Sequence, residues 1–319
     1  MESSDDLERI KGLGSATASR MRSAGLTTIE SLAVTPLREL ISKTGLGHET
    51  ALKISQEARR IMNFGFVRAT EIWERRKSMV RCTTGSNKLD DMFGGGIETQ
   101  AMTELIGDYG AGKTQICLTL AVTAQRSREQ GGLDGNVIFI DTEGTFSPER
   151  VYQIASEREL DPVDILNGIV LARAYNSDHQ CLLIDHLFEK CPEENVKLVI
   201  VDSMISHFRG EYVGRESLSE RQQLLNLYLH KLIRVSEAFN LAVVITNQVQ
   251  ANPAQFWGNP DRPTGGHVMA HACTHRVFLR RGKGGTRLAK IIDSPYLPEN
   301  SAYFNITEKG IEDIEVADS

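Results

Sequence analysis

The stretch Gly107-Asp-Tyr-Gly-Ala-Gly-Lys113-Thr114 reads GxxxxGKT and follows the apolar residues 101–106. An apolar strand, a glycine-rich turn and a helix-forming segment, in that order, are the context of a phosphate-binding loop. The glycines let backbone N–H groups point inward, and the positive end of the following helix strengthens their field. Lys113 is predicted to reach the β- and γ-phosphates of a nucleoside triphosphate, and the Thr114 hydroxyl to hold Mg²⁺. The alternative, a chance glycine-rich turn, does not account for the strand and helix on either side.

Length and composition predict two domains of an ordinary globular protein. The chain has 319 residues, of which 40% are hydrophobic and 24% are charged. The acidic, polar start is unlike a signal peptide, and no apolar run is long enough to span a membrane. The five cysteines are scattered and form no CxxC pair, so we expect reduced thiols in a cytoplasmic protein.

Charge is distributed unevenly along the chain. The net charge of −6 argues against a nucleic-acid partner, but residues 276–290 carry six basic residues and no acidic residue. Residues 299–319 carry six acidic residues and one lysine. A basic stripe is therefore present, and an acidic tail masks it in the total.

The first 60 residues contain two similar pieces, Ile10-Lys-Gly-Leu-Gly-Ser-Ala-Thr-Ala and Thr44-Gly-Leu-Gly-His-Glu-Thr-Ala. Each is a Gly-Leu-Gly turn that opens a helix, as in the helix-hairpin-helix module, whose exposed N–H groups bind a DNA phosphate. The alternative is a helical bundle that only packs. Residues 1–61 hold nine basic and eight acidic residues, so DNA contacts there should be weak and independent of sequence. We expect this domain at 1–61, a linker at 62–80 and a larger domain at 81–319.

The larger domain alternates apolar strands with helical segments. Strands are expected at 101–106, 137–141, 168–173, 197–202, 241–246, 275–281 and 286–292, and helices at 113–129, 148–159, 178–190 and 217–239. Strands separated by helices imply a mainly parallel twisted sheet. The last two strands flank Gly282-Lys-Gly-Gly285 and predict an antiparallel hairpin. The fold class is therefore α/β, preceded by a small all-α domain.

Three strands end in polar residues at the edge where ligands bind in such sheets. Asp202 ends one strand and is predicted to hold Mg²⁺ through water. Glu143 lies just beyond another and is our choice for the group that orients the attacking water; Asp141 is the competitor. Gln248 follows a third strand and offers a neutral amide that senses the γ-phosphate.

Two segments near this edge contain residue types that bind a negatively charged polymer such as nucleic acid. The loop 249–266 contains Phe256 and Trp257, which either stack on bases or fold back onto the domain. The segment 207–221 contains three arginines, a residue that matches phosphate with a bidentate fork. The alternative for that segment is a solvated charged loop, because glutamates cancel its net charge.

These motifs resemble the RecA/RadA family of strand-exchange recombinases, and within it the archaeal RadA proteins. The carriers, in order along nearly the whole chain, include GDYGAGKT, IDTEGTFSPER (140–150), ARAYNSDHQ (172–180), NQVQANPAQFWG (247–258) and DSPYLPE (293–299). The resemblance implies a RecA-like P-loop ATPase core, with ATP and Mg²⁺ as ligands and a monovalent cation such as K⁺ near Asp293. It implies a DNA-dependent ATPase that forms helical filaments on single-stranded DNA and exchanges strands with double-stranded DNA, and a nucleoid-associated place in the cell.

The same resemblance assigns roles to individual residues. It makes Glu143 the catalytic glutamate, assisted by Lys113 and Gln248, and it places Arg150 over the adenine. The segment from Asp293 to Pro298 would cap ATP bound by the adjacent protomer. The remaining implied residues are nucleotide contacts at Gly107, Asp108, Tyr109, Gly110, Ala111, Gly112, Thr114 and Gln115, DNA contacts at Arg209, Arg215, Arg221 and Phe256, and a polymerisation motif at Phe66 and Ala69 with its pocket near Ala155 and Ala172.

Ala111 departs from relatives that often carry serine there, which leaves the hydrolysis rate open. Two other interpretations compete with the recombinase. One is a recombinase-like paralogue that binds ATP and regulates filaments without exchanging strands. The other is a hexameric helicase or clock-type kinase on the same core, which does not account for the front module or for Phe66 in the linker.

Overall fold

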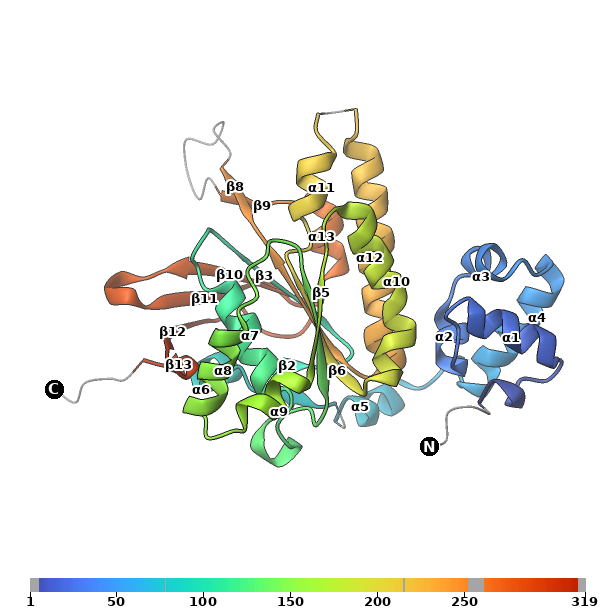
Figure 1. Cartoon of the computed structure of the whole chain (residues 1–319), viewed down its shortest axis with the longest axis horizontal. Helices are drawn as coiled ribbons and strands as arrows, with labels where there is room; N and C mark the ends of the chain where they lie inside the picture. Colours follow the sequence, from blue (N-terminus) through green and yellow to red (C-terminus); the bar gives the residue numbers. More distant parts are fainter. Residues whose placement is uncertain (1–5, 78, 215, 252–260, 315–319) are drawn as a thin grey trace. The chain divides into compact units, whose positions relative to one another are not determined.

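The computed structural model describes residues 6–77, 79–214, 216–251 and 261–314. The chain forms two compact units (Figure 1). The first comprises residues 1–79 and 185–194, and the second comprises residues 80–184 and 195–319. Phe256 and Arg215, both predicted DNA contacts, lie outside the described residues.

The N-terminal part of the first unit is helical, as expected. Its helices are η1 (Asp6–Arg9), α1 (Ser15–Ser23), α2 (Ile29–Val34), α3 (Leu37–Thr44), α4 (His48–Ile61) and α5 (Ala69–Lys77). Helices α1 to α4 pack around a small apolar core that includes Met21, Leu32 and Leu40. The two Gly-Leu-Gly turns open α1 and α4, with Gly14 and Gly47 at the N-cap positions.

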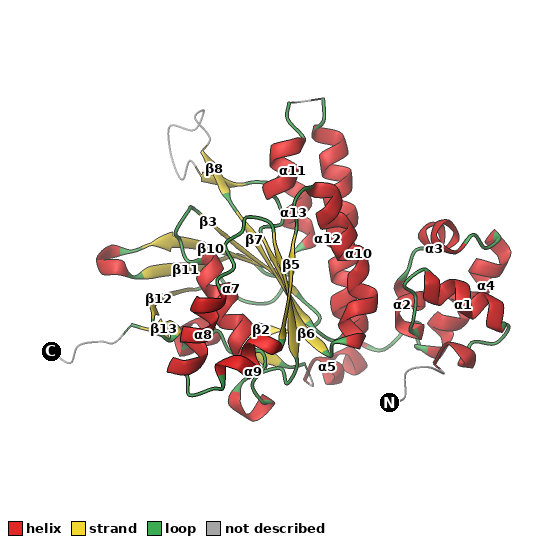
Figure 2. Ribbon diagram, viewed as in Figure 1, coloured by secondary structure: helices red, strands yellow, loops and turns green. Residues whose placement is uncertain are grey.

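The second unit is built on a nine-stranded sheet (Figure 2). From edge to edge the order is β13 (Gly310–Asp313), β12 (Ser301–Thr307), β11 (Arg287–Asp293), β10 (His275–Arg281), β3 (Met102–Gly107), β7 (Ala242–Asn247), β6 (Val196–Asp202), β4 (Asn136–Asp141) and β5 (Ile169–Arg173). The strands from β10 to β5 are parallel, and those from β10 to β13 are antiparallel. The predicted parallel sheet with a C-terminal hairpin is confirmed.

Helices cover both faces of the sheet, which explains why the central strands read as continuous apolar runs. On one face, Phe139 and Leu105 join the core formed with α7 (Lys113–Thr123) and α8 (Pro148–Glu157). On the other, α12 (Leu218–Phe239) packs on β3 and β7 and against α13 (Gly266–Ala272). The remaining elements of this unit are α6 (Asn87–Met92), α9 (Pro162–Asn167), α11 (Ser206–Glu211), η2 (Arg128–Gln130), η3 (Lys283–Gly285), β1 (Arg81–Cys82), β2 (Ile97–Glu98), β8 (Val249–Ala251) and β9 (Asp261–Pro263). Helix α10 (Ser177–Glu193) begins in this unit, and its residues from 185 on belong to the first.

The seven expected strands are confirmed to within one residue at each end, but one helix is six residues shorter than predicted. The helix expected at 113–129 ends at Thr123, because a tight turn follows in which the Ser127 carbonyl accepts hydrogen bonds from the N–H groups of Gln130 and Gly132. Strands β12 and β13 were not expected, and they turn the predicted hairpin into a four-stranded antiparallel half-sheet. None of the described helices is long and apolar enough to cross a membrane.

A buried polar cluster joins three neighbouring strands behind the phosphate-binding loop. Glu104 of β3 is fully buried and accepts hydrogen bonds from Asn247 of β7 and Arg276 of β10, both at 2.6 Å. Asn247 also donates to the carbonyl of Thr264 at 2.7 Å. A buried carboxylate needs such partners because leaving it unpaired is costly. Glu104 therefore fixes β10 and the segment at Thr264 to the centre of the sheet.

We predict that Glu104→Ala lowers the free energy of unfolding by about 3 kcal/mol, because it leaves the Arg276 guanidinium buried without its partner. Glu299→Ala is the control, since Glu299 pairs at 3.0 Å with Lys290 on the surface and exposed pairs contribute at most about 1 kcal/mol. Urea unfolding followed by circular dichroism measures both. Equal losses in the two variants would contradict the role given to the buried cluster.

Candidate nucleotide site

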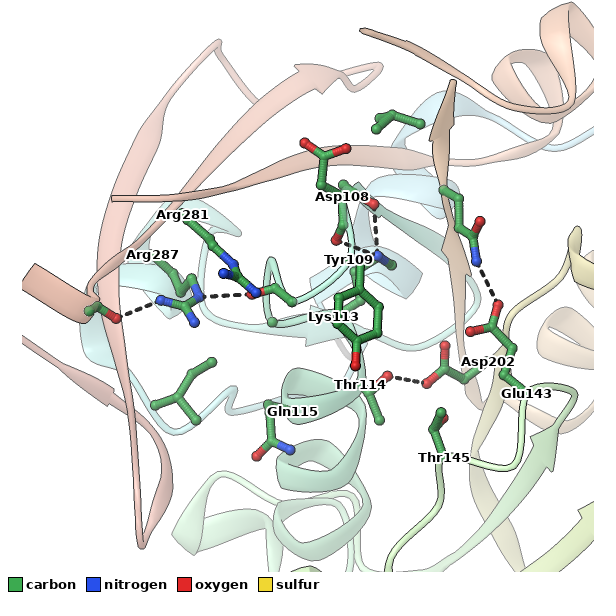
Figure 3. A pocket seen from close by; sticks show the side chains of 17 residues that line it. Asp108, Tyr109, Lys113, Thr114, Gln115, Glu143, Thr145, Asp202, Arg281 and Arg287 are labelled. Carbon is green, nitrogen blue, oxygen red and sulfur yellow. Dashed lines mark hydrogen bonds between the residues drawn. The ribbon is translucent and has the colours of Figure 1, made fainter. Parts of the chain in front are cut away.

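A cavity of about 770 Å³ opens at the carboxyl edge of the parallel strands (Figure 3). The turn between β3 and α7 forms its floor, where Gly110 and Gly112 adopt positive φ angles of 73° and 108°. Glycine adopts such φ angles without steric cost, and the resulting turn directs backbone N–H groups toward the cavity. Lys113 projects into the cavity, and its ammonium donates to the carbonyls of Gly107 at 2.7 Å and Asp108 at 2.9 Å.

The Lys113 ammonium is partly desolvated, and it lies where it can bind an anion. Burial lowers the pKa of its amine, and the carboxylates of Asp202 and Glu143 act in the opposite direction. The cavity thus has a cation at its centre, flanked by backbone N–H donors. These are the groups that bind a phosphate chain.

The metal-binding pair predicted from the sequence is brought together. The Thr114 hydroxyl donates to the Asp202 carboxylate at 2.7 Å, and the Thr246 hydroxyl donates to the other oxygen of Asp202. Burial raises the pKa of Asp202, although the two hydroxyl donors partly offset this effect. A hydroxyl beside a carboxylate at the mouth of a phosphate-binding loop offers the oxygen ligands that Mg²⁺ prefers. The residues present therefore fit the ion.

Glu143 and Asp141 have different surroundings, which separates their roles. Asp141 is buried, and its carboxylate accepts the N–H groups of four consecutive residues, 143–146, at 2.7 to 3.2 Å. It therefore shapes the turn that carries Glu143. The Glu143 side chain is exposed and lines the cavity, where it can meet a water molecule.

The amide of Gln248 contacts the Glu143 carboxylate directly. Gln248 Nε2 donates to Glu143 Oε1 at 2.8 Å, and the Ser203 hydroxyl donates to the same oxygen at 2.9 Å. On its other side, Gln248 Oε1 lies 3.5 Å from the guanidinium of Arg209 on α11. The backbone of Thr264, which follows β9, donates to the Gln248 carbonyl at 2.9 Å. Gln248 thus touches Glu143, a predicted DNA contact and the β8–β9 ribbon.

At the opposite end of the cavity, Gln115 lies at the start of α7 and lines the wall. Arg150 of α8 does not line it but donates to Gln115 at 2.9 Å and to the backbone carbonyls of Thr307 and Glu308. Arg150 therefore connects the cavity wall to the turn between β12 and β13. Ala111, predicted to contact nucleotide, has its side chain buried in the core.

The segment from Asp293 to Pro298 does not line this cavity, and both end residues are exposed. A buried network anchors the segment instead. His275 contacts the hydroxyls of Ser294 at 3.1 Å and Tyr296 at 3.0 Å, and the Tyr296 hydroxyl donates to buried Glu98. The segment is therefore presented on the surface in a fixed conformation.

The other predicted residues are not among those that line the cavity. Arg209 is exposed, and Arg221 is partly exposed on α12; among the described residues neither forms an ion pair with a carboxylate. Phe66 and Ala69 are both exposed. Ala155 of α8 is fully buried and Ala172 of β5 is partly exposed, and the location of a pocket for Phe66 near these two residues stays a prediction.

Four residues of the site were missed by the sequence analysis. Ser203 donates to Glu143, and Thr246 donates to Asp202. Ser203 directly follows the expected strand 197–202, and Thr246 ends the expected strand 241–246. Arg281 and Arg287 line the cavity and come from the basic run 276–290, which was noted only as a charged stripe. The pairing of β10 with β3 brings these two arginines to the cavity, and this pairing has no local signal in the sequence.

Comparison with known families agrees with this geometry. A family model described as Rad51 matches residues 75–314, which is most of the chain. A second, described as a SAM-like helix-hairpin-helix tandem, matches residues 4–60. The Rad51 family consists of RecA-like recombinases and ATPases, and the helix-hairpin-helix match supports DNA binding. The chain therefore belongs to the Rad51 family and carries an N-terminal helix-hairpin-helix domain.

Proposed function

We propose that this protein is a DNA-dependent ATPase and homologous recombinase. It assembles into filaments on single-stranded DNA, pairs that DNA with a homologous duplex and exchanges strands. The observation that carries the proposal is the contact of Gln248 with Glu143, beside the Thr114–Asp202 pair in one cavity. The contact joins the residues proposed to hydrolyse ATP to the segment after Gln248, which is proposed to bind DNA.

Each group in the cavity has a role in ATP hydrolysis. The backbone amides of the loop and Lys113 hold the phosphates, and Glu143 orients the attacking water in line with the γ-phosphate. Thr114 and Asp202 would hold Mg²⁺, and the bound ion would supply positive charge that neutralises the phosphate oxygens. Ser203 and Gln248 fix the Glu143 carboxylate in the orientation that this step needs.

Gln248 also provides the coupling between nucleotide and DNA. A γ-phosphate near Glu143 would compete for the Gln248 amide, and the backbone of Gln248 continues into β8. The ribbon β8–β9 leads to the segment that contains Phe256, and Arg209 approaches the same amide. ATP binding therefore biases the DNA-binding segments, and DNA biases Glu143, which is the reciprocity that linkage requires.

The helix-hairpin-helix domain supplies a second, weaker DNA contact. A Cβ atom built on Gly12, Gly14, Gly45 or Gly47 would meet no other atom within 4 Å, so the space above both turns is open. No side chain caps the N-termini of α1 and α4, and their N–H groups can receive a phosphate. We assign the domain to residues 1–61, the linker to 62–80 and the ATPase core to 81–319.

Exposed apolar surface in the linker supports assembly from identical copies. The Phe66 side chain is fully exposed, and residues 66–68 belong to no helix or strand. Strand β5 forms one edge of the sheet, pairs only with β4 among the described strands and carries the half-exposed Leu171. We assign residues 66–68 as a strand that adds to β5 of a neighbouring protomer, with Phe66 filling an apolar pocket beside Ala172.

In such a filament the segment 293–298 would lie over the nucleotide of the adjacent protomer. Its exposure, and its anchoring by His275 and Tyr296, suit a fixed cap of that kind. Asp293 would then face the neighbour's γ-phosphate, with a monovalent cation such as K⁺ between the two negative charges. ATP bound between two subunits strengthens the filament, and hydrolysis weakens it.

We predict that single-stranded DNA stimulates ATP hydrolysis by the wild-type protein and that Glu143→Gln lowers the stimulated rate by about 100-fold, because it removes the carboxylate that orients water. A coupled assay of ADP release measures both rates. The matched control is Glu149→Gln, at an exposed glutamate in the first turn of α8 outside the cavity. Hydrolysis that is indifferent to DNA in the wild type would refute the proposed coupling.

Strand exchange separates the recombinase from a regulatory paralogue. Circular single-stranded DNA and homologous linear duplex should give joint molecules in the presence of ATP, and heterologous duplex should give none. DNA-stimulated hydrolysis without joint molecules would favour the paralogue instead. ATP-driven unwinding of duplex without homology would favour a helicase.

We predict that Phe66→Glu gives monomers that still bind ATP, because a charge cannot enter an apolar pocket without a large desolvation cost. Light scattering after size-exclusion chromatography measures the mass, and a fluorescent ATP analogue measures binding. Phe64→Glu is the control, since Phe64 is also an exposed phenylalanine of the linker and lies outside the motif. Oligomers of unchanged size in the Phe66 variant would overturn its role.

A further inference from the structure

The basic run 276–290 is divided among different environments. Arg276 is buried against Glu104, and Lys290 pairs with Glu299 on the surface. Arg280 lies over the ring of Phe278, with its guanidinium 5.0 Å from the ring centroid. The two arginines that remain near the hairpin turn, Arg281 and Arg287, line the nucleotide cavity.

Arg281 and Arg287 face each other across the hairpin. They are direct partners in the antiparallel register of β10 and β11. Like charges at such positions repel and destabilise a pair of strands unless an opposite charge lies between them. Among the described residues, no carboxylate forms an ion pair with either guanidinium. The register therefore places two positive charges together at the wall of the cavity without a protein counterion.

Both side chains converge on one atom of the phosphate-binding loop. Arg281 Nε and Arg287 Nε each donate to the carbonyl of Gly110 at 3.2 Å. The contact is close, because a Cβ atom added to Gly110 would lie 1.9 Å from a guanidinium nitrogen of Arg281. These bonds engage only the Nε–H group of each guanidinium with the loop. Arg287 Nη1 also donates to the hairpin carbonyls of Gly285 at 2.6 Å and Thr286 at 3.0 Å. The other donors of Arg281 are bound to no described residue.

The position of the two arginines indicates which phosphates of the nucleotide they can contact. In Figure 3, Arg281 and Arg287 lie on one side of Lys113, whereas Glu143 and Asp202 lie on the other. The carboxylate side is the end for the γ-phosphate and the metal in the proposed function. The arginine side therefore faces the phosphates nearer the nucleoside, where a guanidinium can bind phosphate oxygens with two parallel hydrogen bonds.

We propose that Arg281 and Arg287 form a phosphate clamp that binds the diphosphate part shared by ATP and ADP within the same protomer. This inference rests on the proposed ATP site and adds the hairpin turn to it. Of the two shared phosphates, the α-phosphate keeps its charge as the γ-phosphate leaves, whereas the β-phosphate gains a negative charge. Contacts of the clamp with the α-phosphate therefore stabilise substrate and transition state equally, and their loss raises KM, whereas lost contacts with the β-phosphate also lower kcat.

Titration of a fluorescent ADP analogue into the full-length protein, without DNA, tests the clamp. Arg281→Ala and Arg287→Ala should each raise Kd by about tenfold, the factor expected for one lost charge-assisted hydrogen bond. A non-hydrolysable ATP analogue should lose affinity by the same factor. Arg280→Ala is the matched control, because Arg280 is the neighbour of Arg281 on the same strand and lies outside the cavity. It should leave both Kd values unchanged.

A purely structural role in shaping the loop is distinguished by replacing both arginines with lysine. Arg281→Lys with Arg287→Lys keeps the charge. It should recover most of the affinity that is lost in a double alanine variant, which combines Arg281→Ala with Arg287→Ala. Urea midpoints within experimental error of the wild type establish that the variants are folded. No recovery by lysine would assign the arginines to the shape of the loop and overturn the clamp.

The remaining outcomes separate the clamp from the proposed function. Unchanged ADP affinity in the double alanine variant would overturn the clamp alone, and so would a loss seen only with the ATP analogue, since that result places the arginines at the γ-phosphate. Loss of DNA affinity with normal nucleotide affinity would reassign them to DNA. A wild-type protein that binds neither nucleotide would overturn the proposed function and the clamp together.

Discussion

The buried carboxylate of Asp202 is the constraint on which the nucleotide site depends. It accepts hydrogen bonds from Thr114 at the start of α7 and from Thr246 on β7, and so joins the phosphate-binding loop to two strands of the sheet. Burial raises its pKa, which means that an ion or a donor must stabilise its charged form. The parallel strands deliver this carboxylate and Glu143 to the same edge, and function follows from that convergence.

A second set of contacts joins this edge of the sheet to the β8–β9 ribbon. Asn247 binds Glu104 inside the sheet, while its neighbour Gln248 binds Glu143 in the cavity. Two consecutive residues at the end of β7 therefore have different roles. Asn247 is fixed to the core, and Gln248 faces the proposed γ-phosphate. Because the backbone of Gln248 is also bonded to Thr264, this residue joins the cavity to both ends of the β8–β9 ribbon.

The sequence predicted the parts of the fold and site that depend on local patterns. The apolar runs before Asp141 and Asp202 identified buried strands, and the glycine spacing around Lys113 identified the loop. Strands β12 and β13 were missed because an acidic tail obscured the alternation of buried Ala302 and Phe304 with more exposed neighbours. Arg281 and Arg287 were missed because strand order, which places β10 beside β3, joins residues about 170 positions apart and has no local signal.

The central claim is that ATP bound between subunits acts as an assembly switch for a filament on DNA. Electron microscopy of the wild-type protein with single-stranded DNA tests it most directly, in parallel samples with a non-hydrolysable ATP analogue, with ADP and without nucleotide. The account predicts long helical filaments with the ATP analogue, and short or sparse filaments in the other two samples. Closed rings alone, or filaments of the same length under all three conditions, would contradict it.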